Sequence, residues 1–572
     1  MTIRFLYKGL MISGKKPETC FVLRLHREIA FAVFMLVFPF TGFSQEQIQK
    51  EVVVVRPYQP TIADASKITT LPEIKDTVAI VPDFDYNIFP MPLTVDYEVQ
   101  PITAARLEEK PPSRLYNSHI KLGYGNYTTP YAELSINSLR NRDFSGGVYL
   151  KHHSSHGNIT LDNNTDGLSG FSDNEVLLYG KRMFRESNLW GRAGMTSNQF
   201  NYYGYDTTVD TVFDKNDIRQ NFLFAEASIG LESTVNDSSG LHYDISANYS
   251  HFQDRNKNTE HGINVGAAFQ HYIRGQIIGL EIGYDYFNNT RVADTSNWII
   301  RANPWITKAD DEWRVMAGFN VYYDYYGGTG KTYFHPLASL EFSLVKDYVV
   351  PYVGVDGNLN INNYGQTALE NFYIVPGLRV GNSNNKINLY AGVKGNITRN
   401  ISFNGGGAYR VVDNMHFYIN DTVSEAANKF LVVYDDIEKF HYWGELKASI
   451  GNSFEIMLKA DKYRYEMKLQ EHPWHKPETE LSFSARYNLR GKILLSADIF
   501  HIGERKAKSR LPEADPFRLD GVTDFNLGVE YRYNNLFSAF IKANNITSSG
   551  YRKWNYYPVQ GFNFLAGFTY SL

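Results

Sequence analysis

From His119 to the end of the chain, short segments alternate apolar and polar residues with a period of two. In the stretch from Leu481 to Leu489, every odd residue is apolar, and every even residue is serine, arginine or asparagine. Successive side chains of a β-strand point to opposite faces, so this pattern predicts strands with one apolar and one polar face. The same alternation recurs in residues 263–269, 278–284, 315–321, 493–499 and 537–543. Repeated strands of this kind are typical of a membrane β-barrel with a wet lumen.

The connections between these segments alternate between short and long. Tight turns such as Arg274-Gly275 and Arg490-Gly491 fall at every second junction. Much longer connections lie near residues 155–173, 201–217, 363–385, 414–440, 507–522 and 547–561. Short periplasmic turns and long external loops are the asymmetry of outer-membrane barrels. If residues 371–379 are an excursion within an external loop, the turns predict an all-β fold, a transmembrane antiparallel β-barrel of about 22 strands. The barrel must close, because an open edge would leave amides unpaired in lipid.

The last strand of the chain carries Gly567, Phe568, Tyr570 and Leu572. This spacing resembles the C-terminal signal by which Gram-negative outer-membrane barrels are recognised for insertion. Leu572 departs from the commoner final phenylalanine, and Leu565 departs from the polar residue usually found two positions before the glycine. The resemblance implies a place in the outer membrane, with its lipids and the barrel-assembly machinery as partners.

The N-terminus carries an export signal. Arg24 and Arg27 precede the apolar run from Ile29 to Phe40, and small residues follow as far as Ser44. This order predicts that residues 1–44 are a signal peptide, and translation from Met11 is an alternative start. The single cysteine, Cys20, lies inside that segment, so the exported protein would have neither disulfides nor thiolate chemistry.

Residues 45–116 differ from the barrel region at 117–572. Nine prolines, at positions 57, 60, 72, 82, 90, 92, 101, 111 and 112, predict a Pro-rich extended segment with little core. Near its start stand Glu51, Val52, Val53, Val54 and Val55. A short β-branched run of this kind can add itself as a strand to a partner's sheet edge. It resembles a TonB box, which implies TonB as a periplasmic partner; an ordinary short strand or a tether is the alternative.

The end of the chain also resembles a family. Three short sequences near the C-terminus together resemble the ending common in TonB-dependent receptors. They are Lys542-Ala-Asn-Asn-Ile546, Tyr551-Arg-Lys-Trp554 and Tyr557-Pro-Val-Gln-Gly561. The resemblance covers residues 117–572 and implies a barrel of about 22 strands that takes up a nutrient too large for porins. Such receptors place a plug domain of well over a hundred residues before the barrel. Here only about 70 Pro-rich residues stand in that place.

A barrel of this width needs something to fill its lumen, because lumen width grows with strand number. The sequence offers three candidates: the Pro-rich segment, inward side chains such as Tyr322 and Phe540, and external loops folded inward. Tyrosine pairs lie near several strand ends, where they suit an interfacial aromatic girdle, with a sugar-stacking surface as the alternative. The pairs are Tyr202-Tyr203, Tyr322-Tyr323, Tyr325-Tyr326 and Tyr556-Tyr557.

Two groups of residues are candidate metal ligands. Asp162, Asn164 and Asp166, with a turn glycine at 167 and Asp173 at the twelfth place, match part of a calcium loop. A polar surface loop is the alternative. The histidines 152, 153, 156, 472 and 475 are candidates for a transition metal, although neighbours on one strand point to opposite faces.

No Ser-His-Asp ordering, glycine-rich phosphate loop or paired-carboxylate motif stands out, so we expect no enzyme. The net charge of -4 argues against a nucleic-acid binder. No cofactor is expected apart from the calcium ion. Two functions remain. One is an uptake receptor for a ligand that the sequence does not name. The other is a plugless structural or accessory subunit of an envelope complex that docks a periplasmic partner through residues 45–116.

Overall fold

The computed structural model describes residues 115–572, except 140, 208–213, 235–239, 291–295, 347, 423, 425, 452 and 511–513. The predicted signal peptide, the Pro-rich segment and the TonB-box-like run from Glu51 to Val55 therefore lie outside the described residues.

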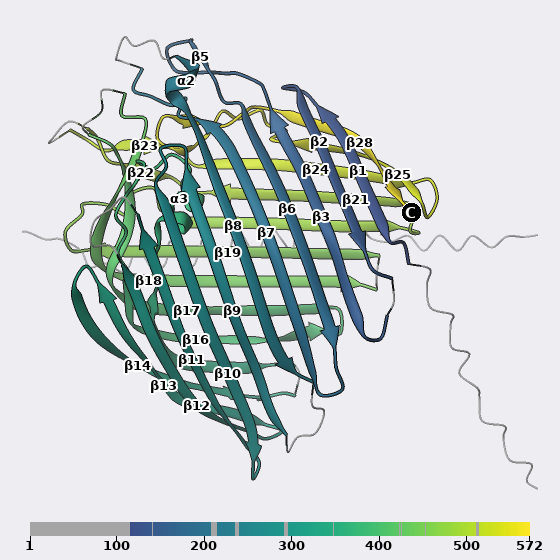
Figure 1. The fold of residues 1–572 in the computed structure, drawn as a ribbon, viewed down its shortest axis with the longest axis vertical. Helices are drawn as coiled ribbons and strands as arrows, with labels where there is room; N and C mark the ends of the chain where they lie inside the picture. Colours follow the sequence, from purple (N-terminus) through teal and green to yellow (C-terminus); the bar gives the residue numbers. More distant parts are fainter. Residues whose placement is uncertain are drawn as a thin grey trace, which may run out of the picture. The chain divides into compact units, whose positions relative to one another are not determined.

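The described chain forms one antiparallel sheet of 22 strands, in which β28 pairs back onto β1 and closes the ring. This confirms the predicted all-β barrel (Figure 1). The barrel strands are β1 (Ser118–Gly125), β2 (Thr129–Asn137), β3 (Phe144–Ser155), β6 (Phe171–Met183), β7 (Ser187–Asn201), β8 (Arg219–Ser233), β9 (Leu241–Asp254), β10 (Thr259–Ile273), β11 (Gln276–Asn289), β12 (Asn297–Ala309), β13 (Trp313–Tyr326), β14 (Thr329–Phe342), β15 (Val350–Asn360), β16 (Ser383–Thr398), β17 (Ile401–Asn420), β18 (Phe430–Ile450), β19 (Phe454–Met467), β20 (Thr479–Leu489), β21 (Ile493–Ile502), β24 (Val522–Arg532), β25 (Phe537–Asn544) and β28 (Asn563–Ser571).

The remaining elements are short and lie in the long connections. They are β4 (Ile159–Thr160), β5 (Asp166–Gly167), α2 (Lys215–Ile218), α3 (Tyr364–Glu370), β22 (Arg505–Ala507), β23 (Phe517–Leu519), β26 (Arg552–Trp554) and β27 (Tyr557–Pro558). No helix among the described residues is long and apolar enough to cross a membrane.

The side chains alternate across the wall as the sequence predicts. On β28, Phe564 and Phe568 are exposed on the outer face, whereas Leu565 and Thr569 are buried on the inner face. Leu565, the departure from the usual signal, thus points into the barrel, where it lies near Gly123 of β1. The outward face is the one that lipid would contact.

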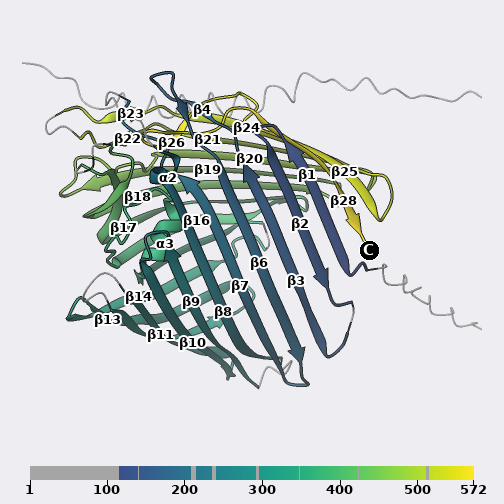
Figure 2. The same cartoon turned by 45° about the horizontal axis from the view of Figure 1, so that its top comes forward.

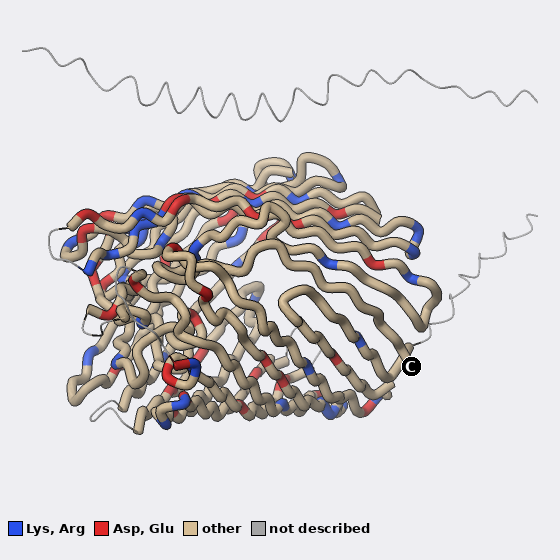
Figure 3. Tube along the Cα trace, turned by 90° about the horizontal axis from the view of Figure 1, so that it is seen from above, with Lys and Arg blue, Asp and Glu red and all other residues tan. Residues whose placement is uncertain are grey.

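The two ends of the barrel differ. At one end the strands join through tight turns, and Arg274-Gly275 and Arg490-Gly491 have the positive φ angles of a two-residue hairpin. At the other end gather α2, α3, β22 and β23, as the two ribbon views agree (Figures 1 and 2). Charged residues of both signs are also dense at this loop end (Figure 3). The chain enters β1 and leaves β28 at the short-turn end.

Candidate functional site: a loop cap and the cavity beside it

Long loops from opposite walls of the barrel meet across its mouth. The Tyr202 hydroxyl, just after β7, donates to the Ile374 carbonyl at 3.0 Å, in the connection between β15 and β16. The Asn428 amide, between β17 and β18, donates to the Tyr202 carbonyl at 3.2 Å. In the ring of 22 strands, β7 lies roughly opposite β15 to β18. The loops that meet here form what we call the loop cap, which comprises the described residues of 156–170, 202–218, 361–382, 421–429, 468–478, 503–521 and 545–562.

The loop cap has an aromatic core of its own. Its buried rings come from the loops and from the strand ends beneath them: Phe200, Tyr202, Tyr203, Phe222, Phe252, Tyr364, Tyr418, Phe430, Trp554 and Tyr557. The rings of Tyr373 and Tyr557 stack with centroids 3.5 Å apart and planes 18° apart. Phe200 stacks on Phe372 at 5.3 Å. Buried aromatic pairs stabilise such a core beyond the apolar area they remove from water.

Buried polar groups tie the loops together. The Tyr557 hydroxyl donates to the Asn428 carbonyl. The Asn555 amide donates to Asn420 Oδ1 at 2.9 Å. The buried Arg505 guanidinium of β22 donates to the carbonyls of Lys553 and Arg552 at 2.8 and 2.7 Å. Removing one partner would leave a buried group unpaired, so these bonds hold the loops in one arrangement.

His475, a candidate metal ligand in the sequence, is part of this buried network. Its Nδ1–H donates to the Tyr418 carbonyl at 3.0 Å, and its Nε2 accepts from the Asn555 backbone N–H at 3.3 Å. Burial lowers the pKa of His475 to about 3, which keeps the imidazole neutral. Both ring nitrogens of His475 are therefore occupied, one by a bond to β17 and the other by a bond to the loop of Asn555.

Part of the cap was visible in the sequence and part was not. Trp554 and Tyr557 belong to the receptor-like ending, and both lie in the aromatic core. The predicted excursion at 371–379 lies inside the long loop, where Ile374 makes one isolated bridge to Phe430. No sequence pattern indicates the roles of Tyr373, Asn428 and Arg505, because each contacts partners that are distant along the chain.

The girdle prediction is wrong for four tyrosines. Tyr202, Tyr203 and Tyr557 are buried in the cap, because loops from other parts of the ring cover them. Tyr322 is also buried and faces inward, as does Phe540, so both side chains project into the barrel. Tyr323 is exposed on the outer face, where a girdle residue would stand.

A cavity of about 430 Å³ lies between the cap and the loop-end halves of β6, β7, β24, β25 and β28. Six aromatic side chains line it: Phe171, Phe200, Tyr203, Phe372, Tyr373 and Tyr551. Polar side chains line it as well: Ser169, Asp173, Gln199, Asn201, Asp524, Asn544, Asn545, Gln560 and Asn563. None of the described residues that line it is lysine or arginine. The cavity thus combines aromatic surfaces, amides and two carboxylates.

The predicted calcium ligands have protein partners. The Asp162 carboxylate pairs with Arg552, and Asp173 of β6 accepts from the Asn198 amide at 2.8 Å. Asn164 occupies a turn with φ 60°, and Asp166 lies in β5. Among the described residues, no three His, Cys, Asp or Glu side chains are grouped to hold a metal ion. Calcium binding by this loop stays a prediction.

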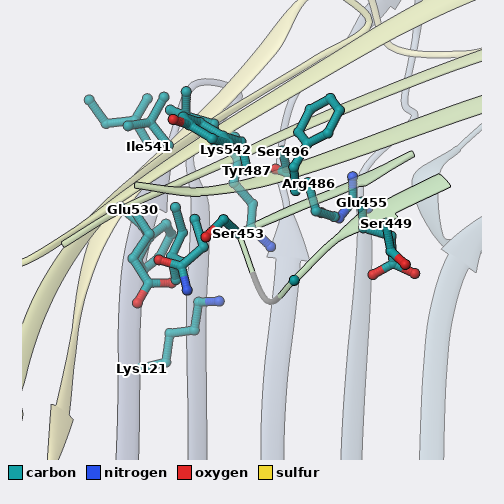
Figure 4. A pocket seen from close by; sticks show the side chains of 18 residues that line it. Lys121, Ser449, Ser453, Glu455, Arg486, Tyr487, Ser496, Glu530, Ile541 and Lys542 are labelled. Carbon is teal, nitrogen blue, oxygen red and sulfur yellow. The ribbon is translucent and has the colours of Figure 1, made fainter. Parts of the chain in front are cut away.

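A second cavity, of about 430 Å³, lies near the short-turn end (Figure 4). Charged side chains of both signs line it: Lys121, Glu455, Arg486, Glu530 and Lys542. The Lys121 ammonium lies 4.6 Å from the centroid of the Phe540 ring. This wall therefore presents mixed charge where the chain enters β1.

No protein-family model and no curated protein matches this chain. Solved structures match its fold. The FrpB iron transporter from Neisseria meningitidis has a TM-score of 0.62 at 9% identity, over 80% of this chain and 82% of that one. This chain therefore shares the barrel fold of that transporter. The siderophore receptor PirA from Acinetobacter baumannii gives 0.62 at 11% identity, over 80% and 81% of the two chains. The ferric-catecholate import receptor Fiu from E. coli K12 gives 0.60 at 10%, over 81% and 82%. At these identities the likeness concerns the fold.

Proposed function

We propose that this protein is an outer-membrane uptake receptor whose cargo is an uncharged, hydroxyl-rich nutrient such as an oligosaccharide. The fold supports a receptor-type barrel, and the residues that line the cavity beside the cap are the evidence for the class of cargo. Aromatic faces pack against the C–H surfaces of sugar rings, while amides both donate to and accept from hydroxyls. Tyr203 and Tyr373 provide such faces, and Asn544, Asn545 and Asn563 provide such amides.

The charge of the cavity lining favours a neutral cargo over the iron compounds that the names of the similar structures mention. A ferric catecholate carries negative charge, and a site for it needs cations to offset that charge. The described lining holds Asp173 and Asp524 and no cation. We therefore expect this chain to reject anionic iron chelates.

Binding to the purified full-length protein tests this proposal. Isothermal titration with maltohexaose, cellohexaose and xylohexaose should detect at least one neutral ligand, and ferric tris-catecholate should not bind. Asn544→Ala should weaken the neutral ligand about tenfold, since the lost hydrogen bonds contribute about 1.4 kcal/mol. Gln270→Ala is the matched control, because Gln270 of β10 is an amide that does not line the cavity. Binding of ferric tris-catecholate, or of no neutral probe, would overturn the proposal.

The proposal also gives roles to residues 1–44 and 51–55, in export of the chain and in supplying energy for uptake. Residues 1–44 are a signal peptide that directs export of the chain, and the run from Glu51 to Val55 adds as a strand to TonB. Proline has no N–H and breaks strand pairing, so Val53→Pro should abolish crosslinking to TonB and leave the amount of barrel unchanged. Val53→Thr, which keeps a β-branched side chain, is the control. Crosslinking that survives the proline would remove this role.

The alternative function is that of an accessory subunit of an envelope complex. The mixed-charge cavity at the short-turn end favours it, because charges exposed at a periplasmic opening suit a docking partner. On this alternative, residues 45–116 reach the partner and the cap stays closed. Failure of all three neutral probes to bind would favour this function.

A further inference from the structure

Two histidines face each other across neighbouring strands on the outer face of the barrel. His251 of β9 and His261 of β10 are direct partners in the register of these strands. Side chains of the same parity are exposed on the outer face, namely Ile245 and Tyr249 on β9 and Ile263 on β10. Neither histidine belongs to the aromatic core of the loop cap or lines the cavity beside it. We call these two residues the histidine pair.

The histidine pair lies close to the loop end of the barrel. Because α2 leads into β8 from the loop end, β9 returns to that end, where it stops at Asp254 and β10 begins at Thr259. A strand rises about 3.3 Å per residue, so the pair lies within about 10 Å of the connection. This depth corresponds to the interface between lipid tails and water, which a metal ion can reach from the loop side.

The backbone register brings the two rings close together. The Asp254 N–H donates to the Asn258 carbonyl at 3.1 Å, so these two residues form a hydrogen-bonded pair at the end of the hairpin. Hydrogen-bonded and non-hydrogen-bonded pairs alternate along antiparallel strands, which makes His251 and His261 a non-hydrogen-bonded pair. Side chains approach most closely at such positions. The ring centroids accordingly lie 5.0 Å apart, with the ring planes tilted by 53°.

The ring nitrogens of the histidine pair are placed to act as ligands. The hydroxyl oxygen of Tyr249 lies 2.9 Å from Nδ1 of His261. When the Nδ1–H donates to this oxygen, Nε2 of His261 keeps a lone pair, and metal-binding imidazoles are commonly oriented by such a bond. The His251 ring makes no hydrogen bond to another of the described residues, so its nitrogens are also open to a ligand.

The neighbours of the histidine pair in the sheet do not oppose a cation. Ala225 of β8 is opposite His251 on its other side, and Asn288 of β11 is opposite His261. Register partners share a face, so the Asn288 amide oxygen is a third donor on the outer surface. Two nitrogens that bind one zinc ion in a tetrahedral site lie about 3.3 Å apart. Rings with centroids 5.0 Å apart meet this spacing when their nitrogens turn toward each other.

We propose that the histidine pair binds a divalent transition-metal ion such as Cu²⁺ or Zn²⁺. Imidazole is a preferred ligand of these ions, whereas Ca²⁺ and Mg²⁺ take oxygen ligands. His251 and His261 supply the two nitrogens, and Asn288 and water complete the coordination. The bound ion joins β9 to β10 through side chains, outside the backbone ladder. These are not the histidines 152, 153, 156, 472 and 475 that the sequence offers as candidates.

Copper binding by the purified full-length protein in detergent, without a histidine tag, tests the proposal. In isothermal titration the wild type should bind Cu²⁺. His251→Phe and His261→Phe keep a flat ring but lose both nitrogens, and each should weaken this site at least about tenfold, since losing even a partner that orients a ligand has this effect. The matched control is His271→Phe, which should bind as the wild type does. His271 shares the strand and the face of His261 but lies opposite Leu241.

Electron paramagnetic resonance with one equivalent of Cu²⁺ counts the ligands directly. The wild type and His271→Phe should show two imidazole nitrogens, and each variant of the histidine pair at most one. A heat-modifiable band shows that each variant is a folded barrel, and the wild-type spectrum needs no variant. Fewer than two imidazole nitrogens in the wild type, unchanged binding in both variants of the pair, equal weakening in His271→Phe, or displacement of the copper by excess Mg²⁺ would each overturn the proposal.

Discussion

Deletion of Phe568–Leu572 is expected to leave no assembled barrel. Phe568–Ser571 is the C-terminal part of β28 (Asn563–Ser571), the last strand, which closes the ring onto β1. Phe568 is opposite Leu122 of β1 and Ala539 of β25, and Tyr570 is opposite Ile120 and Phe537. Leu572 exchanges two backbone hydrogen bonds with Ser118, at 3.1 and 2.9 Å. The deletion would expose the edges of both β1 and β25 to lipid, where unpaired amides are not tolerated.

The measurement is the amount of heat-modifiable protein in the outer-membrane fraction. We expect a fall of at least about tenfold, because a barrel that cannot close leaves several buried amides unpaired. Leu572→Phe is the control, since it keeps the strand and supplies the commoner final residue of the assembly signal. A normal amount of heat-modifiable barrel after the deletion would show that neither closure by β28 nor the signal at Gly567, Phe568, Tyr570 and Leu572 is needed.

The strands could be predicted from sequence because each one meets lipid on one face and the lumen on the other. That requirement is local, so it repeats every second residue, as in β20 and β28. The hairpin turns are local as well. Arg274-Gly275 and Arg490-Gly491 supply the positive φ angles that two-residue hairpins need.

The cap could not be predicted in the same way, because its contacts are not local. Tyr202 donates a hydrogen bond to Ile374, 172 residues away, and no sequence pattern near either residue indicates the partner. A tyrosine at a strand end has the same sequence context whether its side chain contacts lipid headgroups or is covered by another loop. This explains the wrong girdle assignment for Tyr202, Tyr203 and Tyr557. Asp162 is a similar case, since its partner Arg552 is 390 residues away.

The junction between β14 and β15 shows a further limit of sequence patterns. Alternation reveals which face of a strand meets lipid, but it does not reveal which neighbour the strand pairs with, or over what length. β14 pairs with β13 over its whole length, although β15 pairs with only four of its residues. No local pattern indicates the register shift between Asp356 and Asn358 of β15.

The loop cap is expected to hold the pore closed, and Tyr557→Ala to open it. Tyr557 is fully buried at the centre of the cap, stacked on Tyr373 and bonded to the Asn428 carbonyl. Truncating a buried aromatic side chain destabilises a core by about 3–5 kcal/mol, and here that loss falls on loop contacts rather than on the barrel wall. Single-channel conductance in planar bilayers should show a closed full-length protein and an open, flickering variant. Adding Tyr373→Ala should lengthen the open times.

Two further variants of this protein would show which element closes the pore. Tyr533→Ala is the matched control, because Tyr533 is an exposed tyrosine at a short turn and should leave the pore closed. A protein lacking residues 45–112 should also stay closed, since the loops that meet across the mouth remain in place. A pore that opens on this truncation while the cap residues are intact would identify the Pro-rich segment as the seal. On the proposed uptake function, the loops of the cap are the element that cargo must displace, because the cavity beside the cap is lined by the same Tyr203 and Tyr373 that hold the loops together.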